Sequence, residues 1–232
     1  MLILGVYLLL SYAFLPFLWR EVEGQHPALK ELPRLTQTRD EIPGDPLNIA
    51  LVGTEESLNR SMLAAGWHAA DALTFESSLR IAGDTVLRRP YVDAPVSNLY
   101  VWGRKQDLAF EQPVGNDPRQ RHHVRFWHSE LLDGKGRPMW IGAATFDRKV
   151  GFSHTTGQIT HHIGPDVDAE RDKLVTDLQQ AKQLTSIEWV NGFHEHLDGH
   201  NGGGDRYHTD GRLTIGVLIG MKQEPNPADN GK

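Results

Sequence analysis

Two strand-like segments joined by a tight turn constrain the fold of this chain more than any other part of its sequence. The first segment is HHVRFW at residues 122–127, and the second is MWIGAATFD at residues 139–147. The turn between them is DGKGRP, in which Asp-Gly is a strong former of hairpin turns. The sequence therefore predicts two antiparallel strands, with Asp147 at the end of the second strand.

Strand alternation places the side chains of the first segment on two faces. His122, Val124 and Phe126 share one face, and the two apolar residues assign that face to the core. The opposite face carries a row of basic and aromatic side chains: Arg121, His123, Arg125 and Trp127. Guanidinium groups and aromatic rings suit the wall of a cleft that binds an anion or a sugar. We therefore expect the second face to line a polar cleft.

The segments around this hairpin predict further strands and two helices. NIALVG at residues 48–53 has the composition of a buried strand, and Thr54 after it is suited to cap a helix. A second, amphipathic helix is predicted in DVDAERDKLVTDLQQA, and further strands are predicted within 185–193 and 212–220. We expect an α+β domain with a largely antiparallel sheet and a few packed helices, in addition to one N-terminal transmembrane helix.

That transmembrane helix is predicted from residues 2–19, an uncharged apolar run of 18 residues, which is about the length that crosses a bilayer. No basic residue precedes this run and no small-x-small cleavage site follows it, which favours a retained span over a signal peptide. The basic residues near the run lie on its C-terminal side. The positive-inside rule then predicts a single-pass membrane protein whose globular domain faces the cytoplasm.

Composition divides the chain into four parts. The segment after the apolar run carries charges and four prolines, which disfavour regular helix and strand. The last residues are polar and contain proline, a composition typical of disorder. The predicted organisation is a transmembrane helix (1–20), a tether (21–46), a globular domain (47–221) and a disordered tail (222–232).

Overall composition excludes several classes of function. The chain contains no cysteine, which excludes zinc-thiolate and iron-sulfur sites, disulfides and thiol nucleophiles. Its formal net charge is -6, and no run of lysine or arginine is present. Because nucleic-acid binding requires a basic surface, nucleic acid is not expected among its partners.

The polar residues between positions 121 and 172 support two alternative chemistries. In the first, arginines hold an anion while histidine or aspartate transfers protons. The predicted ligand-binding residues are Arg121, Arg125, Trp127, Asp147 and Arg171. The predicted catalytic residues are His123, His162 and Asp168.

In the second alternative, imidazole and carboxylate groups hold a divalent cation such as zinc, manganese or iron. The candidate ligands are His123, His162, Asp166 and Asp168. Asp166 or Asp168 also suits the N-cap of the predicted second helix, so capping competes with metal binding for one of them. This region contains no H-E-x-x-H motif that would select the metal, and the two alternatives remain open.

Blocks of the sequence also resemble a known family. The blocks are GDPLNIALVGT, AAGW, RHHVRFW, WIGAATFD, THHIGPDVDAERD and GGGDRYHTDG. In content and order they are similar to the LssY C-terminal domain family of bacteria, over about residues 44–218. Members of that family are stand-alone membrane-tethered domains, or C-terminal parts of membrane proteins with DedA-like or type 2 phosphatidic-acid phosphatase domains. The resemblance implies an envelope or phospholipid context by analogy, and it assigns no reaction to His123, Arg125 or His162.

Two functions of different classes fit these features. The first is a membrane-anchored, envelope-associated hydrolase that acts on a phosphorylated or lipid-linked small molecule. The second is a non-catalytic accessory domain that uses the same cleft to bind a lipid headgroup or a membrane-protein partner.

Overall fold

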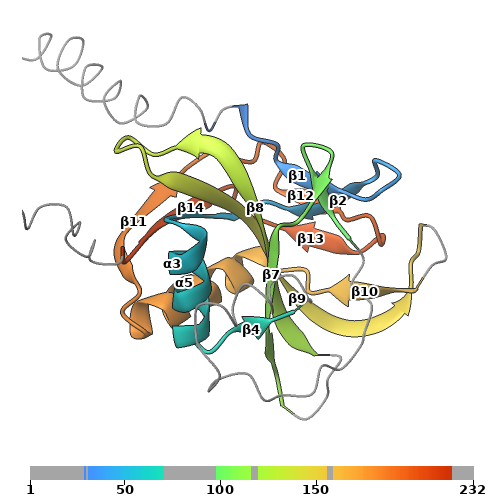
Figure 1. The fold of residues 1–232 in the computed structure, drawn as a ribbon. Helices are drawn as coiled ribbons and strands as arrows, with labels where there is room; N and C mark the ends of the chain where they lie inside the picture. The colour runs from blue at the N-terminus through green and yellow to red at the C-terminus, as the bar shows by residue number, and fades with distance from the viewer. Residues whose placement is uncertain (1–28, 30, 71–97, 116–119, 156–158, 221–232) are drawn as a thin grey trace, which may run out of the picture.

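The structure is a computed structural model, and it describes residues 29, 31–70, 98–115, 120–155 and 159–220. Within these residues it contains two helices, α3 (Glu55–Ala64) and α5 (Val167–Gln180), among many strands (Figure 1). The predicted α+β class is therefore confirmed. Both helices begin where the sequence predicts, because the side chains of Thr54 and Asp166 accept backbone N–H groups of the first turn.

The main sheet has eight strands and is antiparallel except for the pair β14 and β3. Seven of its strands run in the order β11 (Leu184–Val190), β14 (Leu213–Leu218), β3 (Ile49–Val52), β9 (Pro138–Phe152), β8 (Arg121–Leu132), β7 (Leu108–Pro113) and β4 (His68–Ala69). The eighth strand, β10 (Ile159–Ile163), pairs with the C-terminal end of β9. The prediction of a largely antiparallel sheet is thus confirmed for the described residues.

β8 and β9 form the predicted hairpin. The side chain of Asp133 closes its turn by accepting the backbone N–H groups of Lys135 and Arg137. β9 continues past Asp147 to Phe152, so the predicted strand end is wrong. The reason is that this extension pairs with β10, the next strand in the chain, and so continues β9 beyond Asp147.

A second sheet contains the segment that the sequence assigns to a tether. Its strands are β2 (Pro43–Pro46), β1 (Leu35–Gln37), β5 (Tyr100–Val101) and β6 (Arg104–Lys105). The prolines that disfavour regular structure are tolerated in β2, because it lies at the edge of the sheet. The folded part of the chain therefore begins before residue 47. A third, two-stranded sheet consists of β12 (Asp198–His200) and β13 (Arg206–His208).

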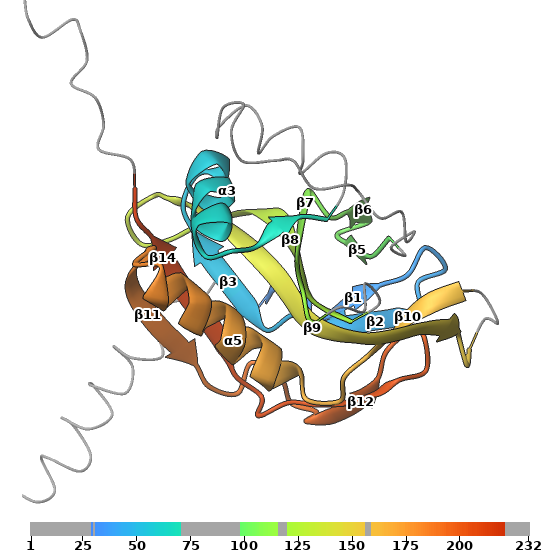
Figure 2. The ribbon, with the colours of Figure 1, turned by 90° about the horizontal axis from the view of Figure 1, so that it is seen from below.

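The main sheet has an apolar core on each face. Val124 and Phe126 of β8 pack with residues of α3 and α5, as the alternation of this strand predicts. Trp127 faces the other way and packs with Leu99 and Val101 of the four-stranded sheet region. Figures 1 and 2 show the two helices with β11 and β14 at one end of the molecule, and β1, β2 and β10 at the other end. The polar residues considered below gather at this second end.

Two predicted segments lie outside the described residues. These are the transmembrane helix at 1–20 and the tail at 222–232. Within the described part of the chain, neither α3 nor α5 has the length and hydropathy that a membrane-crossing helix needs.

Candidate functional site

The basic face of β8 lies inside the protein. Arg121 and Arg125 are each 5 % exposed, and His123 is 0 % exposed. Arg121 Nε donates to Asp147 Oδ2 on β9 (3.1 Å), and Arg125 Nη1 donates to Asp45 Oδ2 on β2 (3.4 Å). The buried arginines thus bring together carboxyl groups from two sheets.

Burial and ion pairing set the pKa values in this charged network. Burial raises the pKa of Asp45 and that of Asp147, while the nearby Arg125 opposes the rise in both. Burial also raises the pKa of Glu111, which accepts a hydrogen bond from Arg121 Nη1 (2.7 Å). Because these charges are withdrawn from water, removing one partner of a pair leaves the other with a large desolvation cost.

Two histidines lie within the same network and are uncharged near neutral pH. Burial lowers the pKa of His161 to about 4, and Arg121 and Arg125 add to the effect. The neutral ring accepts a hydrogen bond at Nε2 from Arg121 Nη2 (3.1 Å). Burial and the same arginines lower the pKa of His123 well below its usual value. Neither ring nitrogen of His123 has a hydrogen-bond partner among the described residues.

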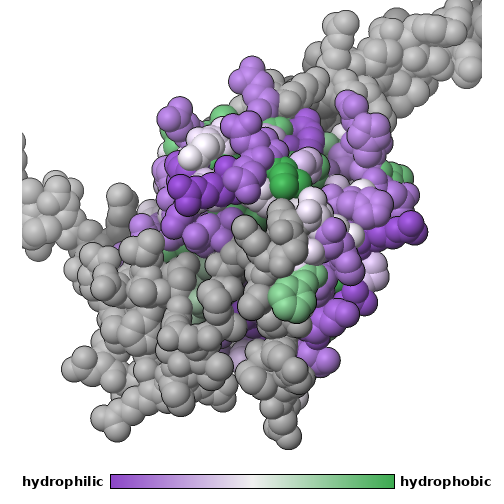
Figure 3. All heavy atoms as spheres, turned by 90° about the vertical axis from the view of Figure 1, so that its right-hand side faces the viewer, coloured by the Kyte–Doolittle hydropathy of each residue, from purple (hydrophilic) through white to green (hydrophobic). Residues whose placement is uncertain are grey.

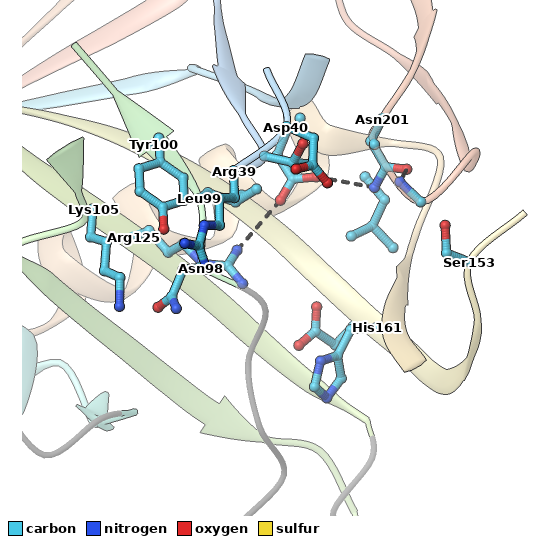
Figure 4. Close-up of a pocket in the computed structure, with 17 residues that line it drawn as sticks. Arg39, Asp40, Asn98, Leu99, Tyr100, Lys105, Arg125, Ser153, His161 and Asn201 are labelled. Carbon is cyan, nitrogen blue, oxygen red and sulfur yellow. Dashed lines mark hydrogen bonds and ion pairs between the residues drawn. The ribbon is translucent and has the colours of Figure 1, made fainter. Parts of the chain in front are cut away.

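A polar pocket of about 570 Å³ borders this network (Figure 4). Cationic side chains line it, namely Arg39, Lys105 and Arg125. Carboxyl groups also line it, namely those of Asp40, Asp45 and Asp147. His161 of β10 adds an imidazole to the polar lining. The pocket therefore offers partners both for anionic oxygens and for hydrogen-bond donors of a ligand.

Segments far apart in the sequence build the pocket. The turn between β1 and β2 and the strands β6, β8, β9 and β10 each supply lining residues. The segment 201–203, between β12 and β13, forms a further side, where Asn201 Nδ2 donates to Asp45 Oδ1 (3.1 Å). Figure 4 shows Arg125 and Asn201 bonded to the same carboxyl group. Asp45 therefore connects three parts of the pocket wall.

The predicted ligand-binding residues are divided by the structure. Arg125 and Asp147 line the pocket, whereas Arg121 is not among the lining residues and contacts the pocket through Asp147. Trp127 is buried in the apolar core, where its Nε1 donates to Arg104 O (3.2 Å). Of the two arginines of β8, Arg125 thus lines the pocket, and Arg121 holds the lining residue Asp147 in place.

The candidate catalytic and metal-binding residues do not form one group. His123 lies in the buried network, with its Nδ1 4.0 Å from Asp147 Oδ2. His162 instead has its Nδ1 2.8 Å from Asp205 Oδ1. The ring of His154 lies beside it, with 5.2 Å between the two ring centroids. The structure therefore groups His162 with His154 and Asp205.

Asp166, Asp168 and Arg171 lie in a separate cluster at the start of α5. Asp166 Oδ1 accepts the backbone N–H of Ala169 (3.0 Å) and caps the helix. Arg171 is 0 % exposed, and its Nη1 donates to Asp168 Oδ1 (3.0 Å) and Asp210 Oδ1 (2.9 Å). Burial opposes the charge of Arg171, yet hydrogen bonds to these and adjacent carboxylates raise its pKa. None of the three is among the described residues that line the pocket.

Sequence reasoning did not identify Asp45, His154 or Asp205. Asp45 lies in a proline-containing segment that predicts a tether, and its partners come from distant strands. Asp205 directly follows the run Gly202-Gly203-Gly204, which signals a close approach of the backbone but no particular chemistry. His154 belongs to no metal-binding motif. Only the three-dimensional arrangement brings these residues to the site.

Comparison with known proteins gives one match. A family model described as the LssY C-terminus matches residues 29–213 of the chain. The matched region includes the residues that line the pocket and the group formed by His154, His162 and Asp205. No curated protein and no solved structure matches the chain.

Proposed function

Because the chain belongs to the LssY C-terminal family, we propose that it is a membrane-anchored, envelope-associated domain that hydrolyses a phosphorylated or lipid-linked small molecule. The observation that carries this proposal is the presence of Arg39, Lys105 and Arg125 around one pocket. Charge-assisted hydrogen bonds from such cations bind phosphate oxygens strongly. Family membership alone assigns no reaction, so the chemical argument rests on the pocket.

The three cations differ in how they would bind a phosphate group. Arg125 is buried and paired with Asp45, so its guanidinium is held in one orientation. Arg39 and Lys105 are exposed, so their side chains can adjust to a ligand. The lining carboxyl groups can accept hydrogen bonds from hydroxyl or amine groups. We therefore infer a ligand that carries such donors in addition to its phosphate.

Asp45 is the lining group best suited to accept a proton from an attacking water. Burial raises its pKa, which makes its carboxylate a stronger base than that of an exposed aspartate. In the proposed reaction, water attacks phosphorus and its proton passes to Asp45. The bond from phosphorus to the leaving oxygen breaks, that oxygen takes up a proton from solvent to give the product alcohol, and Asp45 returns its proton to solvent. Arg125 stabilises the negative charge on the phosphate oxygens. Acid/base roles for His123, His162 and Asp168 stay predictions, because none of them lines the pocket.

The second candidate is a non-catalytic domain that binds a headgroup or a membrane-protein partner in the same pocket. A specific observation favours it: the buried carboxyl groups are already engaged. Asp45 accepts hydrogen bonds from Arg125 and Asn201, and Asp147 accepts one from Arg121. These donors oppose the rise in pKa that burial causes at Asp45 and Asp147, which disfavours proton transfer from water, so the pocket would bind without turnover.

Membrane attachment in this proposal depends on residues 2–19, with the domain on the cytoplasmic side. Figure 3 shows the face of the molecule near β1, β2 and β10, and the described residues visible there are mainly hydrophilic. This face is therefore suited to contact with water rather than with lipid tails. Alkaline extraction of membranes tests the attachment: the full chain should stay in the membrane fraction, and its release would contradict an anchor.

Hydrolysis is tested with the purified full chain and three substrates: p-nitrophenyl phosphate, bis(p-nitrophenyl) phosphate and phosphatidic acid in vesicles. We expect turnover of at least one of them. Lys105→Gln should reduce it by at least about tenfold, because a hydrogen bond to a charged group contributes about 1.5–3 kcal/mol. Lys135→Gln, in the exposed β8–β9 turn, is the matched control and should leave turnover unchanged.

The outcomes separate the two candidates. Saturable binding of the phosphate compounds without release of product would support the accessory domain and contradict the hydrolase. Failure of the wild-type chain to bind or cleave any of them would contradict both. Asp45→Asn addresses the proposed base: it should abolish turnover while binding is retained.

A further inference from the structure

We propose that His154, His162 and Asp205 bind a divalent first-row transition metal ion, for which zinc is the test ion. Each residue offers one ligand atom, and these atoms all lie within 4.8 Å of one another. Two imidazole nitrogens and one carboxylate oxygen form a ligand set that zinc, manganese and iron accept. None of the three residues lines the pocket on which the proposed hydrolysis rests, so the metal site stands independently of that function.

The distances require only a small adjustment to close around an ion. Zinc binds imidazole nitrogen and carboxylate oxygen at about 2.0–2.2 Å, which places two ligands of a tetrahedral site roughly 3.3 Å apart. His162 Nδ1 and Asp205 Oδ1 are 2.8 Å apart, at which distance one proton links them. An ion in place of that proton needs these atoms to separate slightly. His154 is exposed, and its ring can turn toward them.

The backbone holds Asp205 in place before any ion binds. Asp205 Oδ2 accepts the backbone N–H of Ile163 on β10 (3.1 Å), and its own N–H donates to Asn201 Oδ1 (2.9 Å). The backbone N–H of His154 donates to Gly203 O (2.9 Å) in the same loop. The end of β9, the strand β10 and the loop between β12 and β13 are therefore joined at this point. Because these hydrogen bonds already hold the ligand side chains in place, less conformational entropy is lost when an ion binds.

Two glycines leave room for the side chains of His162 and His154. A Cβ at Gly151 would lie 2.8 Å from His162 Nε2, and a Cβ at Gly204 would lie 2.8 Å from Cβ of His154. Gly204 also has a φ of +86°, which other residues rarely adopt. A larger residue at either position would displace a proposed ligand. The glycines of GGGD and KVGF thus have a role beside the metal site.

Burial indicates what kind of metal site this would be. His162 and Asp205 are 3 % and 8 % exposed, whereas His154 is exposed to solvent. The ion would lie at the boundary between the interior and water. Three protein ligands leave a coordination position for water, as in catalytic zinc sites and unlike closed structural ones. Asn201, which bonds to both Asp205 and Asp45, connects the site to the pocket.

Metal titration of the full chain tests the proposal. The chain is purified without an affinity tag, freed of metal with a chelator, and titrated with Zn²⁺ by calorimetry and with Co²⁺ by visible absorption. We expect one ion per chain, and we expect visible absorption bands typical of four- or five-coordinate Co²⁺. His154→Ala should weaken binding by more than about tenfold, since loss of even a supporting residue costs about 10–100-fold. His196→Ala, at another exposed histidine, is the matched control.

The expected pattern is loss with His154→Ala and with Asp205→Asn, and unchanged binding with His196→Ala. Binding of less than one ion per wild-type chain would overturn the proposal. It would also be overturned if His154→Ala bound zinc as tightly as the wild type, or if both histidine variants weakened binding equally. His154 is exposed, so its variant should fold even if Asp205→Asn does not. The titration contains no substrate, and its result is separate from that of the hydrolysis assay.

Discussion

At the scale of single residues, the pair of Arg125 and Asp45 is the contact on which the pocket most depends. Both residues are buried, so Arg125→Met would leave Asp45 without its charged partner. We expect this variant to lower the free energy of unfolding by about 3–5 kcal/mol in urea titrations. The double variant with Asp45→Asn should recover part of the loss, because no unpaired buried charge remains.

A surface pair provides the control for this experiment. Arg104 pairs with Asp107, and their side chains are 40 % and 35 % exposed. Because solvent screens such a pair, Arg104→Met should cost at most about 1 kcal/mol. A loss in Arg125→Met no larger than that in Arg104→Met would contradict a buried ion pair beneath the pocket.

His123 makes stability depend on pH. Its pKa in the folded chain is well below the usual value, so folding keeps it neutral while the unfolded chain binds a proton. The stability that its neutral form contributes is therefore present above about pH 6.5, and it is lost as the pH falls below that value. We expect His123→Phe to reduce the slope of unfolding free energy against pH between roughly pH 6.5 and 5, by up to about 1.4 kcal/mol per unit.

Comparing the pH dependence of stability in wild type and His123→Phe separates the contribution of His123 from those of the titratable and charged groups around it. These groups are Arg121, Arg125, Glu111, Asp147 and His161. His161 acts in the same direction, whereas burial raises the pKa of Asp147, so that its protonation stabilises the fold at lower pH. Both contributions are present in both proteins. Equal slopes in wild type and His123→Phe would show that His123 is not kept neutral by burial.

At the scale of elements, local sequence signals correctly predicted the helices and the central hairpin. Strand pairings that these signals do not encode account for the errors in the remaining elements. Thr54 and Asp166 cap their helices because capping involves only the next few residues. The Asp-Gly turn likewise fixes β8 against β9. By contrast, Gln37 of β1 pairs with Tyr100 of β5, across a separation that no local pattern encodes. The end of β9 pairs with the next strand, β10, although the residues between these two strands contain no turn signal as strong as Asp-Gly. The tether and the strand end were therefore misassigned.

Gly142 shows how closely the central strands pack. A Cβ at this position would lie 2.7 Å from Phe126 Cε1 and 2.9 Å from Ile49 Cγ2. Gly142→Ala should therefore overpack the core and cost about 1–3 kcal/mol in thermal or urea unfolding. Gly134→Ala, in the open turn of the same hairpin, has no atom within 4 Å and is the control. Similar stability of both variants would contradict close packing at Gly142.

At the scale of the whole molecule, the sequence predicts only part of the site. Period-two alternation on β8 correctly separated Arg121, His123 and Arg125 from the apolar face. The predicted hairpin already accounts for Asp147, which lies opposite Arg121 on the neighbouring strand. The alternation could not show that Asp45 of β2 faces Arg125, because that contact depends on how the two sheets meet. Membership of the LssY C-terminal family relates this chain to other proteins, but it does not identify the reaction that the chain catalyses. The chemistry therefore has to be read from the pocket.

The central claim is that this pocket binds a phosphate group, and equilibrium titration of the full chain with inorganic phosphate tests it most directly. The pocket predicts saturable binding of one phosphate per chain. The double variant Arg39→Gln, Lys105→Gln should weaken it by at least about tenfold, since each charge-assisted hydrogen bond contributes about 1.5–3 kcal/mol. Lys135→Gln should bind as the wild type does. Wild-type binding that is absent, or that the double variant leaves unchanged, would contradict the claim.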